Sequence, residues 1–379
     1  MKYIVNGSII LKDGIVDDHV LAFDNKICGI TTKDQIPADS EVIDAKGGYV
    51  APGLVDIHIH GYLGEDTSDG NADGIRKMAN GIMKNGVTSW CPTTMTVSME
   101  EINTALETVR SLKADSKTWD GAEILGVNLE GPYINPKKKG AQAETHIKPL
   151  DADFVIKNAD VISVATVAPE MEGGCEGIKK IRDNCNVRVS VGHTDASFEE
   201  TMAGIDAGAT HITHLFNAQT ALHHRNPGVV GAALLRDVYT ELICDTFHVH
   251  KGLFELIARV KGDKLVLITD CTRAGGMPDG EYTLGGQKIF VNGIECLLED
   301  GTIAGSVLKL NNAVRNVYNN TDMPLWSVFS AASLNPARAI GVDDRKGSLD
   351  AGKDADIIIT DSDFNVLKTI IGGEVKYEI

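Results

Sequence analysis

The sequence predicts an α/β protein that consists of a (β/α)8 TIM-like barrel and a small β-sandwich domain formed by both termini. Three observations lead to this fold class. Apolar strand-like runs alternate with helical stretches through the middle of the chain, both ends are rich in short β segments, and most apolar runs end in a side chain that can bind metal or move protons. At 379 residues, the chain is long enough for one large and one small domain.

The two ends of the chain have the same character. Turn signals from Gly and Asp separate short strand-like pieces at 3–5, 8–11, 19–23 and 26–30. The C-terminal end repeats this pattern at 355–360, 365–371 and 374–377. We therefore assign residues 1–50 and 345–379 to the small domain, and residues 51–344 to the barrel.

The middle of the chain supplies the barrel. The predicted strands are 54–60, 87–93, 124–130, 161–168, 187–193, 211–214, 241–246 and 265–270. Helical stretches separate them, which is typical of parallel strands. Segment 278–300 contains Gly285-Gly286 and Asn292-Gly293, and we expect it to form a β-hairpin inserted after the eighth strand.

The composition indicates which classes of partner are excluded and in which cellular compartment we expect the protein. The formal net charge of -17 argues against nucleic acid or an anionic membrane as a partner. No apolar stretch reaches the length of a membrane span, and the first residues do not resemble a signal peptide. Seven scattered cysteines without a Cys-x-x-Cys pair are typical of reduced thiols, so we expect a cytoplasmic protein.

The first predicted strand contains Asp56, His58 and His60. Alternate residues of a strand point to one face and lie about 6–7 Å apart. Both imidazoles can therefore reach one point at the end of this strand.

Later strands end in further groups of this kind. Glu130, His193 and His214 close three different strands, and one carboxylate with two imidazoles is a common ligand set for a catalytic divalent metal. A water on the open position would become hydroxide near neutral pH. Asp270 ends the last strand, where a carboxylate could take the proton of that water.

Each of these residues taken alone could have a purely structural role. A single histidine at a strand end is more often structural than a ligand, and Asp270 could cap the following helix. Because these groups recur at one end of a single barrel, we favour the metal site. His211 should point out of the barrel, since it lies three residues before His214 on the same strand.

Basic residues could recognise an anionic substrate. Arg225 is suited to bidentate binding of phosphate or carboxylate, although an ordinary surface arginine is an equal alternative. The run Lys137-Lys138-Lys139 fits a solvated loop face better than a phosphate site.

With these residues in view, the sequence resembles the amidohydrolase superfamily. Pro52-Gly53-Leu54-Val55-Asp56-Ile57-His58-Ile59-His60 is similar to its first-strand signature, and 347–356 is similar to its return into the small domain. Within the superfamily the chain most closely resembles the N-acetylglucosamine-6-phosphate deacetylases. The segments that carry this resemblance, in order, are Asn128-Leu129-Glu130-Gly131-Pro132, Gly192-His193-Thr194, 213–218, Thr269-Asp270 and Ile303-Ala304-Gly305-Ser306.

The resemblance implies a role for each matching residue. Glu130, His193 and His214 would bind a divalent metal, Zn²⁺ or Fe²⁺, and Asp270 would be the general base and acid. His58 and His60 would allow a second ion, so one or two ions per subunit are expected. The residues expected to contact a phosphosugar substrate are Ala141, Gln142, Asn217, Ala218, Arg225, His248, Ile303, Ala304, Gly305 and Ser306. Arg225 would reach the neighbouring site of a homodimer, and His250 competes with His248 for one contact.

The expected reaction is hydrolysis of the acetamide of N-acetylglucosamine 6-phosphate to glucosamine 6-phosphate and acetate, in amino-sugar catabolism or recycling. Deacetylation of the galactosamine epimer is the nearest alternative. Hydrolysis of a cyclic amide is disfavoured, because such enzymes typically carry a carboxylated lysine on strand four and 161–168 contains no lysine. A non-enzymatic scaffold should have lost ligands, and all of them are present here.

Overall fold

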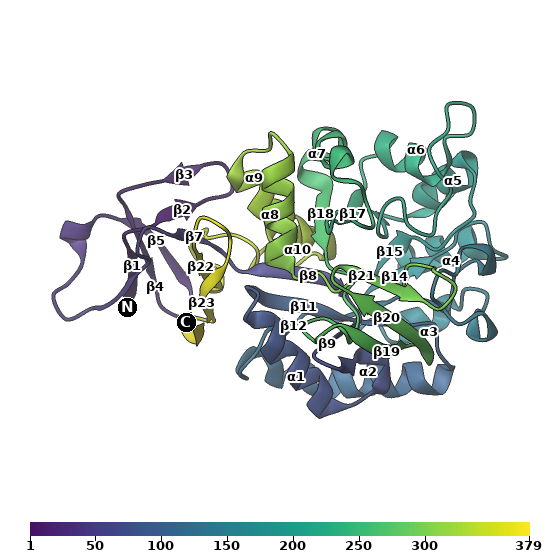
Figure 1. Ribbon diagram of the computed structural model, residues 1–379, viewed down its shortest axis with the longest axis horizontal. Coiled ribbons are helices and arrows are strands. Elements are labelled where there is room, and N and C mark those ends of the chain that lie inside the picture. The colour runs from purple at the N-terminus through teal and green to yellow at the C-terminus, as the bar shows by residue number, and fades with distance from the viewer.

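The computed structural model describes residues 1–379 and contains a barrel of eight parallel strands (Figure 1). Its strands are β8 (Leu54–Ile59), β11 (Val87–Thr94), β13 (Val127–Leu129), β14 (Ile162–Val167), β15 (Arg188–Val191), β16 (His211–Ile212), β17 (Tyr239–Ile243) and β18 (Leu265–Ile268). Each pairs in parallel with the next along the chain. A parallel bridge between Ile59 and Cys271 joins the last strand to the first. The predicted fold class is confirmed.

The barrel strands are almost continuously apolar because helices cover their outer faces. Every residue of β8 and β11 is buried, as expected for parallel strands with two covered faces. The short β12 (Glu123–Ile124) pairs beside β11, and β9 (Gly61–Tyr62) pairs with β10 (Glu65–Asp66).

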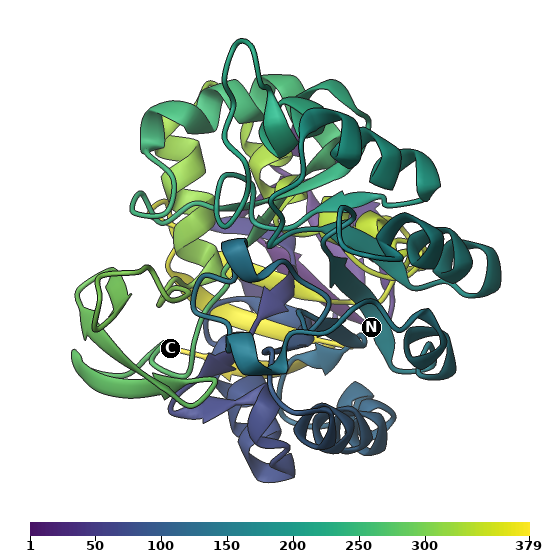
Figure 2. The same cartoon turned by 90° about the vertical axis from the view of Figure 1, so that its right-hand side faces the viewer.

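Helices surround the barrel (Figure 2). They are α1 (Ala72–Met83), α2 (Met99–Lys113), α3 (Ala152–Lys157), α4 (Gly174–Asn184), α5 (Phe198–Ala207), α6 (Gly228–Leu235), α7 (Phe254–Lys261), α8 (Leu310–Asn320), α9 (Leu325–Ala331) and α10 (Leu334–Ile340). Capping boxes fix the start of α2 at Ser98 and of α5 at Ser197. None of the helices combines the length and the apolar character needed to cross a membrane.

The two termini form a separate pair of sheets beside the barrel (Figure 1). One sheet has the order β5 (Ile27–Thr31), β4 (Val20–Phe23), β1 (Lys2–Val5), β6 (Glu41–Asp44). The other has the order β24 (Glu374–Glu378), β23 (Val366–Ile371), β22 (Ile357–Thr360), β7 (Tyr49–Pro52), β2 (Ser8–Ile10), β3 (Ile15–Val16). Because β7 pairs with β22, the N-terminal and C-terminal segments share one core.

Segment 278–300 forms an antiparallel sheet of three strands that follows β18. These are β19 (Gly280–Leu284), β20 (Gln287–Asn292) and β21 (Glu295–Leu298). The sequence predicts only a hairpin here, and β21 adds a third strand. The insertion reaches the barrel mouth, because Gln287 Nε2 donates a hydrogen bond to the carbonyl oxygen of Ala141 at 2.5 Å.

A buried ion-pair network connects the barrel to the C-terminal segment. The Lys346 side chain is 2% exposed, and its Nζ lies 2.6 Å from Glu123, 3.0 Å from Asp354 and 2.7 Å from Asp356. Arg345 also binds Glu123 and Asp354. Burial lowers the pKa of Lys346, but the three carboxylates outweigh burial and raise it above its usual value.

We expect Lys346→Met to destabilise the protein strongly. Removing one partner of a buried ionic network leaves uncompensated buried charge, which costs about 3–5 kcal/mol. Lys12→Met is the matched control, because Lys12 pairs with Asp350 at the surface, where a salt bridge contributes about 0–1 kcal/mol. Urea unfolding of both variants measures the difference, and equal loss of stability in the two would contradict the role of the network.

Candidate active site

Except for His58, which belongs to β8, the candidate ligands lie just beyond the C-terminal ends of the barrel strands. His60 and Glu130 directly follow β8 and β13, while His193, His214 and Asp270 each stand two residues past the end of β15, β16 and β18. These last three have positive φ angles of 46°, 25° and 49°. Such a backbone is uncommon outside glycine and tends to cluster at functional sites. The turn that ends each strand therefore places a polar side chain at the barrel mouth.

Glu130 is the centre of this cluster. Its Oε1 lies 3.2 Å from His193 Nε2, 3.0 Å from His214 Nε2 and 3.3 Å from His58 Nε2. Its Oε2 lies 3.1 Å from His60 Nε2. Burial raises the pKa of Glu130, but the surrounding imidazoles outweigh burial and hold it well below its usual value. Glu130 is therefore a carboxylate that contacts four imidazoles.

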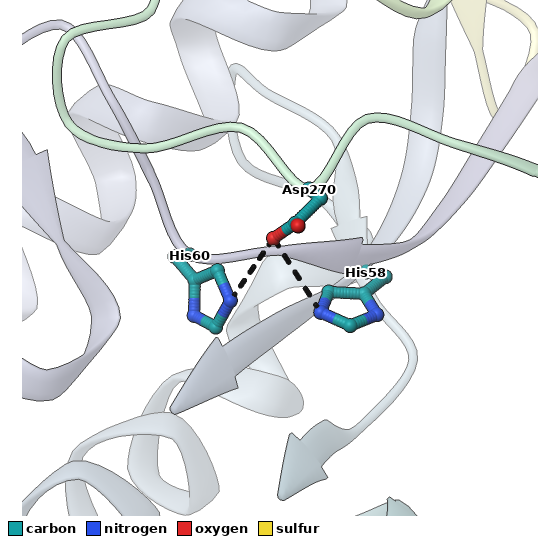
Figure 3. Close-up of side chains that lie close together, drawn as sticks. All are labelled: His58, His60 and Asp270. Carbon is teal, nitrogen blue, oxygen red and sulfur yellow. Dashed lines mark ion pairs between the residues drawn. The ribbon is translucent and has the colours of Figure 1, made fainter. Parts of the chain in front are cut away.

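Asp270 faces the two histidines of the first strand (Figure 3). Its Oδ1 lies 3.2 Å from His60 Nε2 and 3.7 Å from His58 Nε2. Burial raises the pKa of Asp270, but the hydrogen bond to His60 and the nearby imidazole charges outweigh burial, so the net shift is downward. The residue is an ionised carboxylate that can accept a proton.

The donor atoms fit metal binding. They form two buried groups, Glu130 with His193 and His214, and His58 with His60 and Asp270, and the donor atoms within each group lie within 4.8 Å of one another. The Nε2 atoms of His193 and His214 are 3.1 Å apart, close to the separation of about 3.4 Å expected for ligands of one tetrahedral ion. His58 Nε2 is buried without a hydrogen-bond partner. Because Glu130 contacts both groups, it could bridge two ions.

Two buried carboxyl groups outside the candidate ligand set, those of Glu241 and Asp56, contact the ends of the strands that carry these ligands. Glu241 Oε2 lies 2.9 Å from His58 Nδ1 and accepts a hydrogen bond from the backbone N–H of His214 at 3.2 Å. Asp56 accepts a hydrogen bond from Thr269 Oγ1 at 2.7 Å, and burial raises its pKa to about 7. Sequence reasoning missed the role of Glu241, although a charged residue at the start of an apolar strand was the available signal.

We expect Glu241→Gln to weaken metal binding by about 10–100-fold, the usual cost of losing the partner that orients a ligating histidine. The amide keeps the size of the side chain but removes the charge that orients His58. Competition with a chelator measures the affinity. Unchanged affinity, with unchanged thermal stability, would contradict an orienting role for Glu241.

All candidate ligands except His58 line a cavity of about 380 Å³ at the barrel mouth. His60, Glu130, His193, His214 and Asp270 line it, whereas His58 is fully buried beneath. Seven predicted substrate contacts line the same cavity: Ala141, Gln142, Asn217, Ala218, His248, Ile303 and Gly305. Ala304 and Ser306 are buried beside the cavity without lining it, and their contact with substrate stays a prediction.

The structure resolves two points that the sequence left open, the choice between His248 and His250 and the contacts of Gln142. His248 lines the cavity and its Nδ1 lies 2.6 Å from Asp245, whereas His250 is exposed and accepts a hydrogen bond from the backbone N–H of Gly252. Gln142 Nε2 donates a hydrogen bond to Glu130 at 2.7 Å. Its Oε1 accepts one from the backbone N–H of Thr96 at 2.6 Å. One Nε2 hydrogen of Gln142 therefore remains for a ligand.

Arg225 and the lysine run differ in their relation to the cavity. Arg225 is exposed and does not line the cavity of its own chain. Lys137 and Lys138 do line it, and Lys137 pairs with Asp195 at 3.1 Å. The sequence analysis predicted a solvated loop face for these lysines, but two of them lie at the cavity rim.

His211 is buried and packs on Tyr239 with the ring centroids 5.4 Å apart.

Comparison with known proteins shows the family of this chain. The amidohydrolase family model matches residues 49–376. An N-acetylglucosamine-6-phosphate deacetylase of Bacillus subtilis (strain 168) is 39% identical over 99% of this chain and 95% of its own length. An N-acetylgalactosamine-6-phosphate deacetylase of Escherichia coli O157:H7 is 37% identical over 97% of each chain. The solved structure of the N-acetylglucosamine-6-phosphate deacetylase from Pasteurella multocida has a TM-score of 0.94 and 32% identity, and the match covers 99% of each chain. The chain belongs to the amidohydrolase family.

Proposed function

We propose that this protein is an enzyme that hydrolyses the acetamide of N-acetylglucosamine 6-phosphate to glucosamine 6-phosphate and acetate. One observation carries the proposal. Glu130, His193, His214 and Asp270 meet in one cavity of a chain that is 39% identical over almost its whole length to a deacetylase of this specificity. The reaction belongs to amino-sugar metabolism, and we place it in the cytoplasm.

Different residues of the chain would bind the metal and transfer the proton. Glu130, His193 and His214 would hold a divalent ion, Zn²⁺ or Fe²⁺, and His58 and His60 would help to hold a second. When bound, such an ion lowers the pKa of a water and polarises the carbonyl of the acetamide. Asp270 takes a proton from the attacking water as the new C–O bond forms. It then donates this proton to the nitrogen as the C–N bond breaks, which releases the amine and acetate.

The sugar phosphate would lie across the rest of the cavity. Asn217, Ala218 and His248 line it and offer a side-chain amide, a backbone amide and an imidazole. Arg225 would complete the phosphate site from the partner subunit of a homodimer. Its exposure and its absence from the cavity of its own chain support this arrangement, as do exposed apolar side chains on the neighbouring α6 and α7, namely Leu235, Leu256 and Val260.

Two experiments test the proposal. Acetate release from N-acetylglucosamine 6-phosphate should stop after the metal is removed by a chelator and return when Zn²⁺ or Fe²⁺ is added. Activity that survives full metal removal would contradict it. A mixture of Arg225→Ala and Asp270→Asn subunits, each strongly impaired alone, should regain activity, because a mixed dimer has one intact site when Arg225 acts across the interface.

The galactosamine epimer is the second candidate substrate, because the relative from Escherichia coli O157:H7 is 37% identical over 97% of the chain. The ratio of kcat/KM for the two phosphorylated sugars decides between them. We expect the glucosamine epimer to be preferred.

A further inference from the structure

Two apolar side chains line the catalytic cavity but belong neither to the candidate metal ligands nor to the predicted substrate contacts. They are Met95, which directly follows β11, and Leu284, the last residue of β19. Each is 2% exposed, although charged and polar side chains line much of the same cavity. Apolar surface in a cavity of this kind binds the apolar parts of a ligand.

Met95 and the turn that follows Leu284 lie in contact. A Cβ atom placed on Gly285 would lie 3.5 Å from Cε and 3.9 Å from Cβ of Met95. The backbone of Met95 is also fixed, because its N–H donates a hydrogen bond to Ser68 Oγ at 2.9 Å. Met95 from the barrel and Leu284 from the insertion therefore form one apolar wall of the cavity.

This apolar wall lies beside the candidate metal ligands. The strand that Met95 follows, β11, pairs with β8, which His60 follows, and with β13, which Glu130 follows. The backbone N–H of the next residue, Thr96, donates a hydrogen bond to Gln142 Oε1 at 2.6 Å, and Gln142 donates one to Glu130 at 2.7 Å. Met95 is therefore next to the part of the cavity where the amide would react.

The residues that would bind the sugar phosphate lie across the barrel mouth from Met95. Asn217 and Ala218 follow β16, and His248 follows β17. Around the closed barrel β11 is the second strand and β16 the sixth, so their ends stand on opposite sides of the mouth. Phe216, another apolar residue of the cavity, is next to Asn217 on the sugar side. A substrate with its sugar at Asn217 and its amide at the ligands extends toward Met95.

The shape of the amide directs its acyl group to the apolar wall. A secondary amide is planar and trans, so the acyl methyl and the sugar carbon bonded to nitrogen lie at opposite ends of the group. We propose that Met95 and Leu284 contact the acyl methyl of the substrate and limit the length of the acyl group that the enzyme removes. This inference rests on the proposed function and adds the residues that determine acyl specificity.

Acid release from N-acetylglucosamine 6-phosphate and N-butyrylglucosamine 6-phosphate tests the inference. One methylene in a fitted apolar pocket changes kcat/KM by about 10–200-fold, so the wild type should prefer the acetyl substrate by at least about 100-fold. Met95→Ala makes room for the longer chain, and we expect it to shift the ratio of the two kcat/KM values toward the butyryl substrate by at least about tenfold. Leu284→Ala, in the insertion outside the barrel, should shift this ratio in the same direction. Met95→Leu conserves volume and should retain the preference of the wild type.

The ratio separates specificity from damage to the fold, because loss of folded or metal-loaded protein lowers both rates alike. Met83→Ala is the matched control, since it truncates a buried methionine of α1 that does not line the cavity. Wild-type acetate release with a ratio that neither Met95→Ala nor Leu284→Ala changes would overturn this inference alone. An equal shift in Met83→Ala would also overturn it. Release of no acid from either substrate by the wild type would overturn the proposed function, and this inference with it.

Discussion

Asp270→Asn should lower kcat by about 10³-fold, within the range of about 10²–10⁴ that a positioned general acid–base group contributes. The amide keeps the shape of the side chain, but it can neither take the proton of the attacking water nor return it to the leaving amine. Asp270 lies 3.2 Å from His60 and borders the cavity. Single-turnover and steady-state acetate release measure the effect.

Metal analysis of the same variant separates two roles for this residue. Asp270 belongs to the group with His58 and His60, whereas Glu130, His193 and His214 form the other group. We therefore expect the ion held by Glu130, His193 and His214 to remain bound in Asp270→Asn. Complete loss of metal would show that Asp270 acts chiefly as a ligand. Asp344→Asn, an exchange at an exposed aspartate, serves as the control.

Glu130→Gln is the second substitution with a large expected effect. We expect the protein to lose metal. The carboxylate contacts four imidazoles and accepts a hydrogen bond from Gln142, so it is shared by every part of the site. A neutral amide cannot balance the charge of an ion. We expect metal affinity to fall by more than the roughly 10–100-fold that loss of an outer partner costs.

Elemental analysis and chelator competition check the result for Glu130→Gln. His250→Ala is the matched control, because His250 is an exposed histidine outside the cavity. Wild-type metal content in Glu130→Gln would contradict the central position of this carboxylate. Activity should fall in parallel with the metal content.

The barrel could be predicted from the sequence because its strands are buried on both faces. Strands such as 265–270 are apolar runs, and five of the eight predicted strands end in a polar residue that the structure places at the mouth. The shortest strand of the barrel is β16, which consists of His211 and Ile212 only. The chain turns early there, since the positive φ of His214 ends the extended backbone. Propensity alone does not reveal such a turn at a histidine.

Several features depend on contacts between distant parts of the chain. Glu241 supports His58 across 183 positions of sequence, and Lys346 binds Glu123 in the barrel. Nothing in the local pattern of either residue identifies its partner. The position of Ser306 is of the same kind, because its hydroxyl donates a hydrogen bond to the carbonyl oxygen of Thr269 and is drawn into the core.

The acetamide reaction on a phosphorylated sugar is the central claim, and one comparison tests it most directly. Acetate release by the metal-loaded protein should be measured with N-acetylglucosamine 6-phosphate and with N-acetylglucosamine. We predict a far higher kcat/KM for the phosphorylated sugar, and Arg225→Ala should remove most of this preference. Equal rates with both sugars would contradict the phosphate site, and no acetate from either would contradict the proposed reaction.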